Sequence, residues 1–123
     1  MVPIKPTANW QKKCCKLKKT LQRIRLDYAA TLTLEDLAME AGLSPKYFCR
    51  MFRQVTGRTP VDYLNYYRIE CAAEQLLTTC EPVTDIALSC GFNDLSYFVK
   101  QFRRYKGCSA SIYRRQAQVQ DEL

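Results

Sequence analysis

Two segments of this chain repeat one another, and the repeat limits what the chain can fold into. Residues 37–68 are LAMEAGLSPKYFCRMFRQVTGRTPVDYLNYYR, and residues 86–115 are IALSCGFNDLSYFVKQFRRYKGCSASIYRR. Gly42 matches Gly91 at an offset of 49 residues, and one inserted residue then makes the offset 50. At that offset the matched residues are Phe48, Phe52, Gly57, Thr59 and Tyr63 with Phe98, Phe102, Gly107, Ser109 and Tyr113. Two copies are too few for a solenoid, so the pattern predicts two related units.

Helix signals in the first copy predict a helix-turn-helix. Thr33, followed three residues later by Asp36, is a variant of the capping box, and Gly42 suits the end of this first helix. Ser44 can then cap a second helix that has Pro45 at its first position. Two short helices joined by a tight turn that contains glycine form this motif.

The second copy predicts the same motif. A helix near residues 83–90 leads to Gly91 at the turn, and Asn93 is expected to cap a helix over residues 94–106. Leu95, Phe98, Phe102 and Tyr105 form one apolar stripe along that helix, and Ser96, Lys100, Arg103 and Arg104 lie on the opposite side. One face is therefore expected to be buried and the other to meet negative charge.

The remaining segments predict two further long helices. Thr59 caps and Pro60 begins a helix that extends to about Thr79, and no internal glycine or proline interrupts it, so we expect it to be stiff. An amphipathic first helix, expected to pack on the first unit, has its apolar residues at Trp10, Cys14, Leu17, Leu21, Ile24 and Tyr28.

The expected organisation is all-α, with about seven helices in two helix-turn-helix lobes joined by the long rigid linker helix. Residues 1–16 would be a tail or linker and the start of the first helix, 17–58 the first lobe, 59–80 the linker helix, 81–115 the second lobe and 116–123 a tail. The opening MVPIKPTAN resembles a linker from which a further domain has been cut.

Charge and cysteine content narrow the class of function. The 123 residues have a net charge of +7, which favours nucleic acid or an anionic membrane surface as the partner. Two stretches, 41–61 and 95–120, contain cations and no acid, so the charge forms two separate basic patches. Seven cysteines without a CxxC pair or any histidine give no zinc-finger spacing, and they indicate a reducing cytoplasm. We expect no metal, no cofactor and no catalysis, and no segment is long and apolar enough to span a membrane.

The segment DIALSCGFNDLSYFVKQFRRYKGCSASIYRR resembles the signature of the AraC/XylS family of bacterial transcription regulators, with its IA..GF, SYF, F+..G and YR elements. The first copy and RIECAAEQLL are also similar to the family, which usually has proline where this chain has Ala110. The resemblance implies seven helices and a cytoplasmic activator that binds double-stranded DNA. It also implies RNA polymerase as a partner, and a sensing or dimerisation domain in the full-length protein.

The resemblance also assigns roles to residues of the two second helices. Periodicity turns Phe48, Met51, Phe52 and Val55 inward, and leaves Lys46, Cys49, Arg50 and Arg53 outward. The family's base-reading positions fall on Lys46, Cys49, Arg50, Ser96, Val99 and Lys100, with Tyr97 beside them. Expected phosphate contacts are Arg53, Arg58, Thr59, Arg103, Arg104, Lys106 and Ser109. Core positions are Phe48, Phe52, Phe98, Phe102, Tyr63 and Tyr113, and Arg68 is expected to be structural.

Two other functions compete with this one. A basic chain with an amphipathic helix can bind RNA or an anionic membrane surface, although the other features of the chain do not favour a membrane. A DNA-repair protein that accepts alkyl groups on cysteine would need clustered cysteines, and here the cysteines are scattered.

Overall fold

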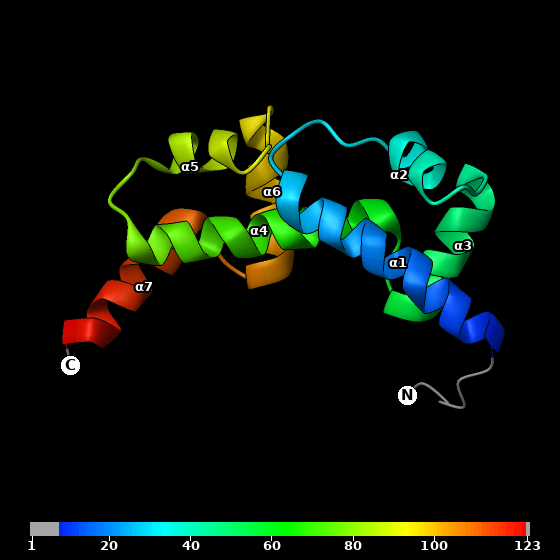
Figure 1. The fold of residues 1–123 in the computed structure, drawn as a ribbon. Coiled ribbons are helices and arrows are strands. Elements are labelled where there is room, and N and C mark those ends of the chain that lie inside the picture. Colours follow the sequence, from blue (N-terminus) through cyan, green and yellow to red (C-terminus); the bar gives the residue numbers. More distant parts are fainter. Residues whose placement is uncertain (1–7, 123) are drawn as a thin grey trace. The chain divides into compact units, whose positions relative to one another are not determined.

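The structure, a computed structural model, describes the backbone of residues 8–122 and the side chains of residues 15–118. It has seven helices and no strand in the described chain, which confirms the all-α prediction (Figure 1). The helices are α1 (Ala8–Asp27), α2 (Leu34–Glu40), α3 (Pro45–Thr56), α4 (Pro60–Thr78), α5 (Val83–Ser89), α6 (Leu95–Lys106) and α7 (Ala110–Glu122). Residues 116–122, expected to be a tail, continue helix α7.

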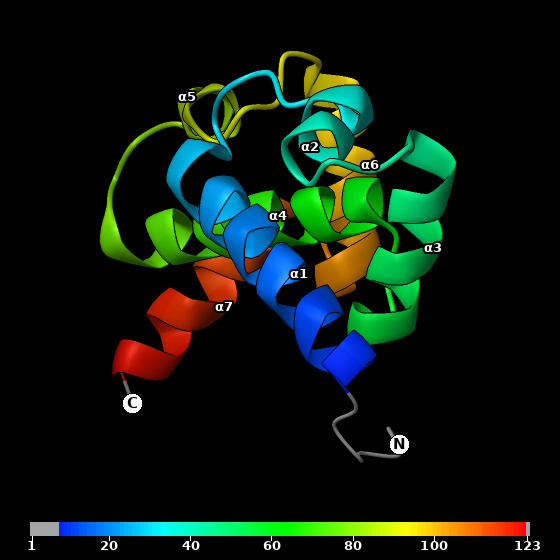
Figure 2. The ribbon, with the colours of Figure 1, turned by 45° about the vertical axis from the view of Figure 1, so that its right-hand side comes forward.

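The chain forms two compact units whose boundary lies inside helix α4. The first unit holds α1, α2, α3 and α4 as far as Tyr63, and in it α1 and α2 both pack against α3 (Figure 2). The second unit holds the connection Tyr28–Thr31, α4 from Leu64 onward, α5, α6 and α7. In this unit α6 packs against both α5 and α7.

The first helix-turn-helix, α2 and α3, has the predicted caps. The Thr33 hydroxyl accepts a hydrogen bond from the Asp36 amide at 3.1 Å, and the Asp36 carboxylate accepts one from the Thr33 amide at 3.4 Å. This exchange is the predicted capping box. At α3 the Ser44 hydroxyl accepts from the Tyr47 amide at 3.3 Å, and the helix ends at Gly57 with a left-handed φ of 80°.

The second helix-turn-helix, α5 and α6, begins its second helix one residue later than predicted. Asn93 is not the cap: the Asp94 carboxylate accepts from the amides of Ser96 at 2.9 Å and Tyr97 at 3.4 Å. Asp94 lies 50 residues after Ser44, so the extra residue of the second copy falls in the turn, before the cap. A carboxylate oxygen can accept two N–H groups at once, which makes it an effective cap.

The aromatic residues that recur in the two copies form the same packing in each unit. Phe48 and Phe52 on α3 and Phe98 and Phe102 on α6 are fully buried, as predicted. The Tyr63 ring meets the Phe52 ring edge-on at 5.6 Å, and Tyr113 meets Phe102 in the same way at 5.5 Å. Such edge-to-face pairs are favourable beyond the area that they bury. In α1, Leu17 and Ile24 are buried, whereas the side chains of Trp10 and Cys14 lie outside the described ones.

Arg68 of α4 joins three parts of the second unit, which agrees with its expected structural role. Its Nε donates to the Tyr28 carbonyl at 2.6 Å, and its Nη2 donates to the Ala30 carbonyl at 2.9 Å. The turn between α5 and α6 approaches the same place at Gly91, which has φ of 96°. A Cβ at Gly91 would lie 2.8 Å from the Tyr28 carbonyl oxygen and 2.9 Å from Arg68 Nε, so only glycine fits.

We predict that Gly91→Ala will lower the stability of the chain well beyond the cost of its backbone conformation. Gly42→Ala is the matched control, because Gly42 also has a left-handed φ, of 70°, but nothing lies within 4 Å of its Cβ position. The control should lose about 1–2 kcal/mol, the cost of a left-handed residue with a side chain. Thermal unfolding of both variants measures the difference, and equal losses would show that the close approach at Gly91 does not matter.

Candidate nucleic-acid interface

Helix α3 presents a basic outer face whose cations have no partner among the described side chains. Phe48, Met51 and Phe52 are buried, so Lys46, Arg50 and Arg53 are turned to solvent, and Cys49 is half-buried. Among residues 15–118, no hydrogen bond or ion pair engages the side chains of these three cations. Lys46 and Arg50 lie in the first half of the helix, the part that meets base edges when such a helix enters a major groove.

Helix α6 presents an outer face with fewer charges in its first half, where Lys100 is the one cation. Phe98 and Phe102 are buried, and Ser96, Val99 and Lys100 are exposed. The structure thus brings the predicted outward residues of each helix onto one face. Farther along α6, Arg103 is exposed and Arg104 lies over the Tyr105 ring at 5.1 Å from its centroid.

Tyr97 differs from its neighbours on α6 because its hydroxyl has a partner inside the protein. The side chain is 42% exposed, yet the hydroxyl accepts a hydrogen bond from Nδ2 of Asn65 on α4 at 2.7 Å. No local pattern predicts this role of Asn65, which lies 32 residues away and on another helix.

Several residues expected to contact phosphate have partners within their own unit. The Lys106 ammonium lies 2.5 Å from the Glu70 carboxylate, and it is also over the Tyr113 ring. Partial burial opposes the charge of this ammonium, but the hydrogen bond and charge of Glu70 together raise the pKa of Lys106 above its usual value. Lys106 therefore stays charged and is held in an internal pair, which counts against its expected role.

Arg58, Thr59 and Ser109 also have local partners. Arg58 lies 3.5 Å from the Asp62 carboxylate, one helical turn away. The Thr59 hydroxyl accepts from the Asp62 amide at 3.1 Å and the Ser109 hydroxyl from the Ile112 amide at 3.2 Å, so each caps its own helix. The hydroxyls of Thr59 and Ser109 are thus occupied by helix capping. Among the expected phosphate contacts, Arg53 and Arg103 remain as exposed cations.

Arg114 shows that a cation in an acid-free stretch need not face a partner. Its Nε donates to the Leu76 carbonyl at 3.0 Å, and its Nη2 donates to the Thr79 carbonyl at 3.3 Å. The Leu76 carbonyl lies in the last turn of α4, where carbonyls lack partners within the helix, and the Thr79 carbonyl lies just after it. A cation there also suits the helix dipole. Arg114 is therefore a cap for α4.

The structure gives no support to the alkyl-acceptor alternative. Within the part of the chain that is described, no group of three histidine, cysteine or acidic residues could hold a metal. Burial raises the pKa of the Cys90 thiol to about 11 and also raises the pKa of the Cys71 thiol. Both thiols therefore stay protonated and unreactive at neutral pH.

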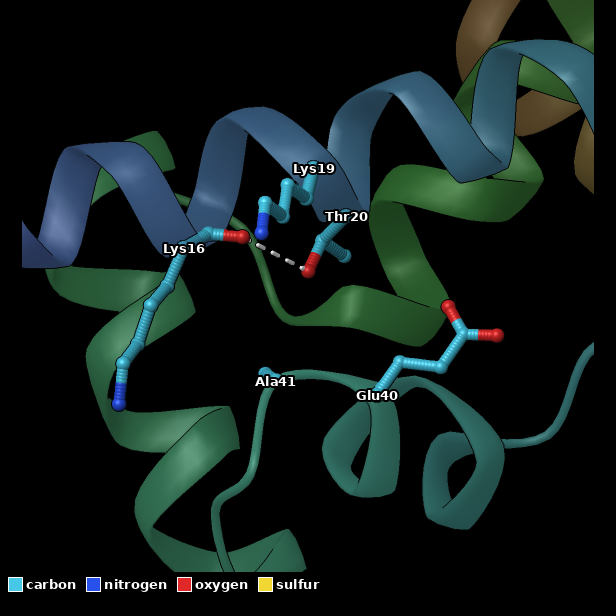
Figure 3. A pocket seen from close by; sticks show the side chains of 5 residues that line it. All are labelled: Lys16, Lys19, Thr20, Glu40 and Ala41. Carbon is cyan, nitrogen blue, oxygen red and sulfur yellow. Dashed lines mark hydrogen bonds between the residues drawn. The ribbon is translucent and has the colours of Figure 1, made fainter.

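A small pocket lies in the first unit, between α1 and the end of α2 (Figure 3). Its volume is about 170 Å³, and it is lined by Lys16, Lys19, Thr20, Glu40 and Ala41. Binding sites for small molecules are usually larger, about 300–1,000 Å³ and mostly apolar. Because Glu40 is also paired with Arg23, we assign no ligand to this pocket. None of the helices that the structure describes is both long and apolar enough to cross a membrane.

Two helix-turn-helix units, each with an exposed basic second helix, define a protein of the helix-turn-helix DNA-binding class. A family model described as a helix-turn-helix domain matches residues 37–116. The chain belongs to the AraC/XylS family of transcription regulators, and it corresponds to the DNA-binding domain of that family.

Three similar proteins illustrate the relationship. The uncharacterized HTH-type transcriptional regulator YdeC of Bacillus subtilis is 32% identical over 100 residues, which are 81% of this chain and 34% of YdeC. The HTH-type transcriptional activator AarP of Providencia stuartii is 39% identical over 83 residues, 68% of this chain and 62% of AarP. The chain therefore spans less than two thirds of either relative.

The third is a solved structure, the DNA-binding domain of the global transcriptional factor AdpA in complex with a target DNA. Its TM-score is 0.78 at 28% identity, and the match covers 85% of this chain and 94% of the AdpA chain. The fold of this chain is therefore one that is known in a complex with DNA.

Proposed function

We propose that this chain binds double-stranded DNA at specific sequences, with α3 and α6 as the two recognition helices, and that it regulates transcription. The observation that carries the proposal is the exposed, unengaged set of cations on α3, on a helix held by a cap at one end and a buried aromatic pair below. Helix α6 also has a cap at its start and a buried aromatic pair on its inner face, with Lys100 and Arg103 exposed on the outer one. The family of the chain and the AdpA complex support it.

The residues of α3 supply most of the base reading in this proposal. The guanidinium of Arg50 has the fork geometry that matches O6 and N7 of guanine, and Lys46 reaches guanine or a phosphate. Cys49 is small and half-buried, so it contributes an apolar or water-mediated contact. On α6, Val99 suits a thymine methyl and Lys100 a guanine, while Ser96 is a short polar neighbour. Because α6 offers a single cation in this region, the second unit is the more tolerant of sequence.

Phosphate contacts come from residues farther from the start of each recognition helix. Arg53 and Arg103 are exposed at matched positions of the two copies, and Arg104 is exposed beside Arg103. The starts of α4 and α7, after Thr59 and Ser109, attract a phosphate as helix N-termini do. Pro60 has no amide to give, and the Asp62 and Ile112 amides are bonded to the caps, so this attraction is a minor part of the proposal. These contacts hold the protein on DNA without selecting a sequence.

The wider setting is also a proposal. Activators are named among the relatives, AarP for example, so we infer that this domain works in the cytoplasm with RNA polymerase as a partner. The chain spans 34% of YdeC, which leaves room for a sensing or dimerisation domain in a full-length protein.

The affinity of the chain for duplex DNA should fall steeply between low and physiological salt. Lysine and arginine side chains that neutralise phosphates release bound counterions, and the release weakens as salt rises. Equilibrium binding to duplex DNA, an RNA hairpin and anionic lipid vesicles, each at several salt concentrations, tests the proposal. A nearly flat salt dependence, or tighter binding to the RNA or to the vesicles, would contradict it.

Two arginines on matched faces should have different effects on specificity. Arg50→Ala should weaken binding to the preferred site by about 1–3 kcal/mol and relax the preference at one base pair. Arg103→Ala should weaken binding to all sequences alike and lower the slope of the salt dependence by about one. Selection of bound sequences from a random duplex pool, done with each variant, measures both profiles. If the two profiles agree, the separation of base-reading from phosphate-binding residues is wrong.

The length of helix α4 predicts the spacing of the DNA site. Its 19 residues extend about 28 Å at 1.5 Å per residue, close to the 34 Å or so of one DNA turn. We therefore expect two unlike half-sites about one turn apart, bound in successive major grooves by α3 and α6. Inserting about five base pairs between the halves should abolish protection of one half, since it then faces the other side of the duplex.

Inserting about ten base pairs returns both half-sites to the same side of the duplex but doubles the distance between them. Protection of one half should therefore still be lost. Footprints of the original and the two lengthened sites measure this. Protection of both halves after the ten-pair insertion would show that α4 does not act as a rigid spacer.

A further inference from the structure

Asn65 is a polar side chain in a position that is otherwise apolar. It is 7% exposed, on the part of α4 that also buries Leu64 and Ile69. A buried amide is costly unless it is hydrogen-bonded, and this one donates from Nδ2 to the hydroxyl of Tyr97 at 2.7 Å. The bond therefore fixes the Tyr97 hydroxyl to α4, across the packing between α4 and α6.

Tyr97 is held at three points. Its amide donates to the Asp94 carboxylate at the start of α6, and its ring packs against Phe92 with the ring centroids 6.2 Å apart. The hydroxyl is the third point, through Asn65. Its ring nevertheless remains partly exposed beside Ser96 and Lys100, so a fixed tyrosine lies on the proposed DNA face.

The direction of the hydrogen bond leaves the Tyr97 hydroxyl able to donate. A phenolic hydroxyl has one proton and accepts through its lone pairs. Because Asn65 supplies the proton of the bond between them, the hydroxyl keeps its own proton for another acceptor. The acceptors that dominate the surface of duplex DNA are phosphate oxygens, and tyrosine hydroxyls are among the groups that bind them.

The tether to α4 also favours a phosphate over a base. Base edges lie at the floor of a groove about 8.5 Å deep, and a side chain must project from the recognition helix to reach them. The Tyr97 hydroxyl is instead hydrogen-bonded to the Asn65 side chain on α4. It is therefore placed for the DNA backbone at the edge of the groove that α6 enters.

We propose that the Tyr97 hydroxyl donates a hydrogen bond to a phosphate oxygen of duplex DNA, and that Asn65 is the positioning residue that holds this hydroxyl. The proposal rests on the function proposed above, and it moves Tyr97 from the base-reading residues to the phosphate contacts. Among its described side chains, the first unit has no such arrangement. Tyr47, at the matched position of α3, is 43% exposed, and no partner of its hydroxyl is found among the described residues.

Three substitutions test the proposal: Tyr97→Phe, Asn65→Leu and the two together. Tyr97→Phe should lower the affinity for duplex DNA about tenfold, which corresponds to a hydrogen bond to a charged group. The loss should be the same for the preferred site and for unrelated duplexes. The slope of the salt dependence should not change, because a neutral hydroxyl releases no counterion.

Asn65→Leu should cause a similar loss in the wild-type background and none in the Tyr97→Phe background, because Asn65 acts through the hydroxyl. Tyr47→Phe is the matched control, and it should change affinity by less than about twofold since its hydroxyl is not held in place. Thermal unfolding of each variant shows that the fold is intact. Tyr97→Phe keeps the ring and its packing, so this variant alone decides whether the hydroxyl matters.

The outcomes are separable. If wild-type chain binds no duplex DNA, the proposed function itself fails. If wild-type chain binds but Tyr97→Phe binds equally well, or changes the preference at one base pair, the phosphate contact is wrong. If Asn65→Leu weakens binding further in the Tyr97→Phe background, Asn65 acts through the fold and is not a positioning residue.

Discussion

The burial of two phenylalanines, one turn apart, on the second helix of each unit is the constraint from which the rest of the structure follows. Phe48 and Phe52 on α3, and Phe98 and Phe102 on α6, are completely buried. Once this face of a helix is fixed inward, the 3.6-residue period decides which side chains point outward. Lys46, Arg50 and their counterparts on α6 are thus exposed as a consequence of where the aromatic rings lie.

The sequence could predict this much because the decisive signals are local. Caps such as Thr33 and Ser44, and the left-handed glycine at residue 57, act within four residues of their partners, so spacing alone identifies them. The sequence does not identify the cap of α6, because Asn93 and Asp94 are both good capping residues. The position of the inserted residue within the second turn could not be decided from the alignment of the copies.

The part of the candidate site that the sequence could not predict depends on pairs far apart in the chain. Lys106 is a cation in a basic stretch of the sequence, as expected of a phosphate contact. Its charge is paired with Glu70, which lies 36 residues away in the chain, so the pair has no local signal. Asn65 likewise has no local signal. Gln101 occupies the position of Met51 in the first copy and is buried, and its side-chain oxygen Oε1 has no hydrogen-bond partner in the part of the chain that the structure describes. Two copies with the same spacing of apolar residues can therefore differ in which buried positions are polar and in how those groups are hydrogen-bonded.

The boundary between the two units has a consequence for how the domain can be divided. It falls between Tyr63 and Leu64, inside an unbroken helix, and the connection Tyr28–Thr31 belongs to the second unit although its neighbours α1 and α2 belong to the first. A fragment that ended at Tyr63 would keep this connection but lose Arg68, which holds it. A fragment that began at Leu64 would lack the Thr59 cap of α4 and the connection itself. Neither unit can therefore be produced alone with all the contacts that hold it in the intact domain.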